Sequence, residues 1–198
     1  RHLLIEALVH YAPIDPERAR WQSPQGPVEA KAVIFAEGWR AAGRNPWFGR
    51  LPYRLSKGEI LTLRLPEALP PALFNRGKWL LPRGDAAQTG STWSWDKLDD
   101  SPTSHGRAAL LKGLGTLLRV TGGAGVLDHR AGVRPTTQDS RPFIGRHPHY
   151  PRLVCFNGLG SKGALYAPGM AARLLDHLHG GAPLPPEAAL ARHPEAFA

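Results

Sequence analysis

The sequence predicts an α+β protein: a mixed or antiparallel sheet with one inserted helix, together with part of an α/β layer. Two observations lead to this class. Short strand patterns fill the middle of the chain, where residues 58–65 alternate polar and apolar side chains. The last third then reads as a strand, a glycine turn and a helix within residues 151–178.

The first 52 residues predict a short helix, a hairpin, one buried strand and a loop. Leucines at helical spacing indicate a helix over residues 1–11, which prolines end. Residues 18–30 predict a hairpin around a Ser-Pro-Gln-Gly turn. The continuous apolar run 32–35 is typical of a strand buried on both faces, and residues 40–52 predict a loop.

Further strands and two helices follow. Ser104 is the expected cap of the first helix, and the last predicted strand before the C-terminal third carries Arg134. The proline-broken residues 137–150 predict a loop, and the tail after residue 178 predicts loose order. The remaining expectations are strands at 58–65, 78–81, 88–95, 126–135 and 153–156, a turn at 82–85, and helices at 103–118 and 164–178.

Composition excludes several classes of protein. The 198 residues are 42% hydrophobic, enough for a core, and contain no apolar run long enough to cross a membrane. The net charge of +9 is spread evenly along the chain, which disfavours a nucleic-acid-binding arm. The single Cys155 lies in a strand pattern and is expected to be a buried thiol in a reducing compartment. No signal peptide is visible, so the expected location is cytoplasmic.

Gly158, Gly160 and Gly163 spell G-x-G-x-x-G between the last predicted strand and helix. A full dinucleotide-binding unit also needs a second strand and an acidic residue about 20 positions further on. Neither is present, because the helix leads into glycines and a proline-rich tail. The loop therefore predicts a backbone that a ligand can approach closely at a helix N-terminus, or a structural turn.

Metal and hydrolase chemistry are disfavoured. The close histidine pairs, 147/149 and 177/179, have no cysteine or carboxylate at ligand spacing, so no metal ligands are assigned. No nucleophile-elbow pattern accompanies a Ser-His-Asp set.

Residues 132–148, GVRPTTQDSRPFIGRHP, followed by residues 156–178, resemble the C-terminal portion of the D-amino-acid oxidase superfamily of FAD enzymes, with glycine oxidases the most similar. Three upstream segments agree in family order: AVIFAEGW, LPYRLSKGEIL and WLLPRGDAAQTGSTW. The resemblance spans roughly residues 27–185. The family opens with a strand, a true G-x-G-x-x-G and a helix for the ADP half of FAD. This sequence begins downstream of that unit, so an incomplete FAD-binding fold is expected.

The resemblance implies roles for particular residues. Arg134 matches the arginine that pairs with the substrate carboxylate, and Thr92 and Trp93 would line the substrate side. The positions that match the flavin-binding residues are Ala36, Gly38, Lys57, Gly158, Leu159, Gly160, Ser161, Lys162, Gly163 and Ala164. No residue is assigned as a catalytic acid or base. For Lys57 and Trp93, a purely structural place in the sheet or core is the open alternative.

The implied function is oxidation of a small amine or amino acid, with FAD as the cofactor. The implied organisation is a partial FAD-domain segment at 1–50, a substrate-binding sheet at 51–130, and a C-terminal FAD-domain segment at 131–198. The missing N-terminal half, or a partner subunit, would complete the cofactor site. Two alternatives stay open: a non-catalytic remnant or interaction module, and the flavin domain of a tRNA wobble-uridine modification enzyme.

Overall fold

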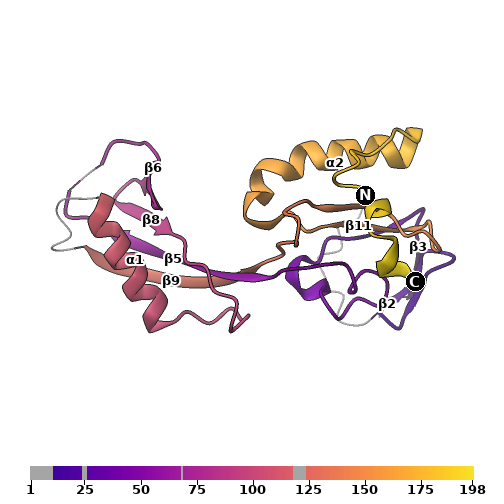
Figure 1. The fold of residues 1–198 in the computed structure, drawn as a ribbon, viewed down its shortest axis with the longest axis horizontal. Helices are drawn as coiled ribbons and strands as arrows, with labels where there is room; N and C mark the ends of the chain where they lie inside the picture. The colour runs from indigo at the N-terminus through magenta and orange to yellow at the C-terminus, as the bar shows by residue number, and fades with distance from the viewer. Residues whose placement is uncertain (1–10, 24–25, 68, 118–123) are drawn as a thin grey trace. The chain divides into compact units, whose positions relative to one another are not determined.

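A computed structural model describes residues 11–23, 26–67, 69–117 and 124–198. The helix expected at residues 1–11 lies almost wholly outside this described part. The chain forms two compact units (Figure 1). Unit 1 combines the chain up to Arg54 with Pro135–Ala198, and unit 2 is Leu55–Arg134. The sequence placed these divisions at 50/51 and 130/131, and the roles assigned to the three segments stay predictions.

Unit 2 is built on an antiparallel five-stranded sheet of order β6-β7-β8-β5-β9. Along β5 the alternating pattern places Leu61 and Leu63 in the core. The predicted strand over 88–95 ends at Gly90, and an irregular segment continues to residue 103. The strands are β5 (Ser56–Arg64), β6 (Phe74–Arg76), β7 (Lys78–Arg83), β8 (Ala86–Gly90) and β9 (Gly125–Arg134).

Helix α1 (Ser104–Leu117) packs on one face of this sheet (Figure 1). Leu110 and Leu114 join the core cluster that contains the β5 leucines. The N-cap of α1 was predicted at Ser104, one residue too late. The hydroxyl of Thr103, not of Ser104, accepts a hydrogen bond from the backbone N–H of Gly106 at 2.9 Å.

Unit 1 contains a mixed three-stranded sheet of order β10-β11-β4, formed by β4 (Val33–Phe35), β10 (Phe143–Arg146) and β11 (Leu153–Asn157). Strand β11 is parallel to β4 and antiparallel to β10. The prediction that 137–150 is all loop was wrong, because Phe143 and Ile144 are fully buried in β10. Burial of β4 on both faces was also wrong: β4 is a sheet edge, and Ile34 is 47% exposed.

A second small sheet in unit 1 confirms the predicted hairpin, with β2 (Arg20–Ser23) and β3 (Gly26–Glu29) paired antiparallel. Strand β1 (Ile14–Asp15) pairs with the other side of β2. A short 3-10 turn, η1 (Gly38–Ala41), follows β4. The loop region expected at 40–52 is irregular but contributes the buried Phe48 and Leu51 to the core.

Helix α2 (Gly163–Gly180) follows β11 and the 3-10 turn η2 (Gly160–Lys162), and it ends at the left-handed Gly181. The tail is not loosely ordered as predicted. It forms two 3-10 turns, η3 (Leu190–Arg192) and η4 (Pro194–Phe197). Leu190 is buried in the same cluster as Phe143, so tertiary packing orders the tail. Among the described residues, none of the helices has the length and apolar character to span a bilayer.

Candidate functional site

In unit 1, glycine turns follow the carboxyl ends of the two parallel strands. Gly38 (φ +63°) comes after β4, and Gly158 (φ +75°) and Gly160 (φ +58°) come after β11. Each φ lies in the left-handed region that glycine adopts without strain. In open α/β sheets, ligands bind at the carboxyl ends of parallel strands, so this edge is the natural ligand side of unit 1.

Asn157 joins the two turns. Its side-chain nitrogen donates to the carbonyl of Gly38 at 2.9 Å and to the hydroxyl of Tyr53 at 3.2 Å, and its side-chain oxygen accepts from the N–H of Gly158 at 2.8 Å. The sequence reasoning missed Asn157. Its place directly before the glycines, at the end of an apolar run, was the signal available.

The glycines of the motif are not equivalent. A Cβ on Gly158 would lie 2.7 Å from the methyl of Thr137, and one on Gly160 would lie 3.0 Å from the methyl of Thr136. A Cβ on Gly163 would meet only Leu159, at 3.6 Å. The first two glycines are therefore required by close packing and backbone conformation, whereas the third is not.

The N-terminus of α2 lies directly after these turns. Its first turn contains no acidic residue, and no side chain caps it. The leading N–H groups of a helix lack partners within the helix and carry partial positive charge. Ser161, Lys162 and Ala164 are exposed there, and Ala36 is exposed at the end of β4. Apart from Lys57, the residues predicted to bind the cofactor thus lie in unit 1, at these turns and the start of α2.

In unit 2, Arg134 ends β9 and its guanidinium lies over Gly58 of β5. Nη2 donates to the hydroxyl of Ser91 at 2.7 Å and to the carbonyl of Thr92 at 3.3 Å. The ring of Trp93 stacks on the guanidinium, with the charged carbon 4.3 Å from the ring centroid. The structure therefore brings the predicted substrate residues together. Ser91 and Gly58 were not predicted.

One edge of this guanidinium is unsatisfied. Nη1 of Arg134 is buried and has no hydrogen-bond partner among the described residues. Burial lowers the pKa of Arg134, but a guanidinium still stays protonated near neutral pH. A buried unpaired donor costs free energy, and a carboxylate oxygen would satisfy it with a charge-assisted hydrogen bond.

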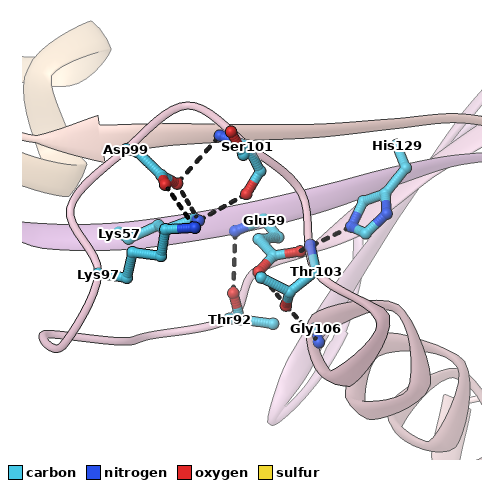
Figure 2. A network of polar contacts seen from close by, with 9 residues as sticks. All are labelled: Lys57, Glu59, Thr92, Lys97, Asp99, Ser101, Thr103, Gly106 and His129. Carbon is cyan, nitrogen blue, oxygen red and sulfur yellow. Dashed lines mark hydrogen bonds and ion pairs between the residues drawn. The ribbon is translucent and has the colours of Figure 1, made fainter.

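Lys57 lies elsewhere in unit 2. Its side chain is 2% exposed, and its ammonium contacts Asp99 and the carbonyl of Ser101, each at 2.5 Å (Figure 2). The hydrogen bond from the Lys57 ammonium is the main reason that the pKa of Asp99 is lowered to about 2. Because side chains alternate along a strand, Lys57 faces the side of the sheet opposite to the face of Gly58 and Arg134. A flavin contact of Lys57 stays a prediction.

Glu59 lies on the same face as Lys57 and anchors α1 (Figure 2). Its carboxylate accepts the backbone N–H of Thr103 at 2.9 Å and the hydroxyl of Thr103 at 2.8 Å, and lies 2.7 Å from Nε2 of His129. Burial acts to raise the pKa of Glu59, but the hydrogen bonds from Thr103 and His129 outweigh it and lower the pKa. The carboxylate fills the place where a side chain on Gly106 would stand.

No group of three or more His, Cys, Asp or Glu side chains that could hold a metal ion occurs within the described part of the chain. Cys155 is buried in the core, as its strand pattern predicted, and burial raises the pKa of its thiol.

A comparison with protein families gives the class. The family model described as FAD dependent oxidoreductase matches residues 10–177, so this chain belongs to that family, whose cofactor is FAD. The incomplete FAD-binding fold that the sequence predicted is not established by this match and stays an expectation.

Individual relatives are more specific. The chain is 28% identical over 166 residues to a glycine oxidase of Pseudomonas putida, covering 82% of this chain and 46% of that protein. It is 29% identical over 170 residues to a glycine oxidase of Bacillus subtilis, covering 82% of this chain and 45% of that protein. The chain thus spans about half the length of the curated relatives it matches.

Solved structures share the fold. An iminodiacetate oxidase from Chelativorans sp. BNC1 superposes with a TM-score of 0.75 at 24% identity, covering 88% of this chain and 50% of that one. A glycine oxidase from Geobacillus kaustophilus gives a TM-score of 0.70 at 25% identity, covering 85% of this chain and 48% of that one.

Proposed function

We propose that this chain supplies the carboxylate-binding arginine and one wall of the flavin site of an FAD-dependent amine or amino-acid oxidase. The observation that carries the proposal is Nη1 of Arg134, which is buried and has no hydrogen-bond partner among the described residues. Ser91 and Thr92 hold the other guanidinium nitrogen, and Trp93 fixes its plane. A guanidinium fixed in this way leaves Nη1 to bind a carboxylate oxygen through a charge-assisted hydrogen bond.

The residues of unit 1 fit a flavin. Gly158 and Gly160 keep side chains away from the turn, and the start of α2 offers partial positive charge. We assign the flavin wall to residues Gly158–Ala164 with Ala36 and Gly38, and Lys57 stays a candidate for a flavin contact. Backbone N–H groups there would stabilise negative charge on a reduced ring. The ADP portion would be held by an N-terminal half or a partner subunit outside this sequence.

Residues Gly158–Ala164 would hold the flavin ring, and bound FAD would supply the two-electron oxidation of the substrate amine to an imine that water hydrolyses, with oxygen as the final electron acceptor. The contribution of this chain is positioning. Arg134 would hold the substrate carboxylate, and Trp93 would keep the guanidinium in place. No side chain is assigned as a base, because a neutral amine needs none. The substrate class is a small amine or amino acid, in keeping with the glycine oxidase relatives.

The test uses the arginine side-chain NMR signals of the purified chain. Acetate is the probe, because it carries only the carboxylate, and ethylamine is the control. We expect acetate to shift the Nε–Hε signal of Arg134, with the signal assigned by its loss in Arg134→Met. A signal that stays in place up to saturating acetate would overturn the assignment. Flavin absorbance after addition of FAD tests the flavin wall separately.

A further inference from the structure

We propose that Lys57 is a positioning residue for the carboxylate site: by binding Asp99 and Ser101 it holds residues 91–103 so that Trp93 stays over Arg134. We call residues 91–103 the strap. The inference rests on the proposed function of Arg134. It assigns to Lys57 a role within unit 2 that does not require contact with the substrate.

The strap takes the place of β8 beside β5. Strand β8 ends at Gly90, opposite Ile60, and the strap then pairs with the earlier part of β5. Lys57 and Ser94 exchange backbone hydrogen bonds of 2.8 and 3.0 Å. The N–H of Thr92 donates to the carbonyl of Glu59 at 3.2 Å, and the N–H of Glu59 donates to the Thr92 hydroxyl at 2.9 Å. Trp93 therefore lies between two positions that are fixed to β5.

The strap reaches both faces of the sheet. Its first residues, Ser91 and Trp93, contact Arg134 on the face of Gly58. Its later residues, Asp99 and Ser101, contact the ammonium of Lys57 on the opposite face (Figure 2). Lys57 therefore holds the strap at two places. Its backbone pairs with Ser94, before Trp95, and its ammonium binds Asp99 and Ser101, after Trp95.

Lys57 needs these contacts as much as the strap does. A buried ammonium without a partner is costly, and both partners of Lys57 belong to the strap. The other cation on Asp99 is Lys97, at 3.2 Å, whose side chain is 77% exposed. An exposed ion pair of this kind contributes little, so Lys57 is the stronger of these two cationic contacts of Asp99, beside the backbone N–H of Ser101 at 3.1 Å. Trp93 is itself 47% exposed, and its ring contacts Arg134 and Trp95, which also belongs to the strap.

The experiment labels the chain with 5-fluorotryptophan and records ¹⁹F NMR spectra, with Trp93 assigned by Trp93→Phe. Lys57→Met and Asp99→Ala break the same contact from its two sides. We expect each to displace or broaden the Trp93 resonance, and the double variant to match the single ones, because contacts already lost do not add. Lys112→Met, at an exposed helical position, should leave Trp93 in place.

Trp79 in β7 reports the fold of the sheet. An unchanged Trp93 resonance in both single variants would overturn the proposal, and so would equal displacement of Trp79, which would make Lys57 merely structural. If Lys57→Met fails to fold, the Trp93 resonance of Asp99→Ala alone tests the proposal. In the folded variants we also expect roughly 5-fold weaker acetate binding at Arg134. Absence of acetate binding in the parent chain counts against the proposed function only, since the Trp93 signal is read without ligand.

Discussion

Glu59 of β5 and His129 of β9 are diagonal neighbours on adjacent strands, with the carboxylate oxygen 2.7 Å from Nε2 of the imidazole. The side chain of Glu59 is almost fully buried, and Thr103 at the start of α1 gives it two further hydrogen bonds. One carboxylate therefore joins two strands to the helix.

We expect Glu59→Gln to lower the free energy of unfolding by about 2 kcal/mol, because the buried amide offers one acceptor oxygen where the carboxylate offers two. The pKa of Glu59 is below its ordinary 4.5, so its contribution is complete above that pH and is lost as the pH falls through the lower folded-state pKa. Urea unfolding at pH 7 measures the loss of stability in Glu59→Gln, and the same measurement at pH 3 shows how much of that loss disappears as the pH falls. Glu67→Gln, at an exposed position, is the control. Equal midpoints for both variants would contradict this account.

Gly58→Ala should remove carboxylate binding without unfolding the chain. The added methyl would occupy the place of the Arg134 guanidinium, so acetate affinity should fall roughly tenfold or more. Gly132→Ala is the matched control. Gly132 lies on β9, directly opposite Gly58 of β5, and a Cβ at this position meets nothing within 4 Å. Acetate titration of both variants, followed at the Arg134 signal, makes the comparison. Retained binding in Gly58→Ala would show that the guanidinium does not need this position.

The glycine motif offers a paired test. Gly158→Ala should destabilise unit 1 by about 2 kcal/mol, because its φ is +75° and the methyl would clash with Thr137. Gly163 has a helical φ of −53° and free space, so Gly163→Ala should be neutral or stabilise by up to about 1 kcal/mol. Thermal unfolding of the two variants distinguishes them, and equal losses of stability would refute the difference in packing described above.

His147 makes unit 1 sensitive to acid. Burial lowers the pKa of His147 to about 4, and its Nδ1 accepts the N–H groups of His149 and Tyr150. The unfolded state, with a pKa of 6.5, takes up the proton first, so stability is complete above pH 6.5 and falls as the pH drops toward 4. His147→Asn keeps an acceptor without the titration. Its unfolding free energy should depend less on pH over this range, and parallel curves for parent and variant would exclude the mechanism.

Local patterns were enough to predict the elements that carry their own periodicity. Strand β5 alternates along its length, and α2 begins where the glycine turn ends. Strand β10 was missed because its four residues lie between Arg-Pro and His-Pro, which indicate a loop. Ile34 was misjudged because an apolar run does not say whether a strand lies at a sheet edge.

Some residues of the candidate site could be predicted from the sequence, and others could not. Arg134 and the glycines were assigned roles by resemblance, and those roles stay predictions. The partners of Lys57 could not be predicted, because Asp99 is 42 residues away and is brought near only by the path of the strap. Gly58 was equally hidden, since its role depends on a guanidinium from a neighbouring strand.

The run Arg134-Pro135-Thr136-Thr137 contributes to two different parts of the structure. Its arginine ends β9, its proline carbonyl accepts the N–H of Gly160 at 3.2 Å, and its threonines shape the turns at Gly158 and Gly160. Arg134 is the last residue of unit 2, and the three residues that follow belong to unit 1. A substitution at Thr136 or Thr137 should therefore alter the glycine turns of unit 1, whereas a substitution at Arg134 should alter carboxylate binding in unit 2.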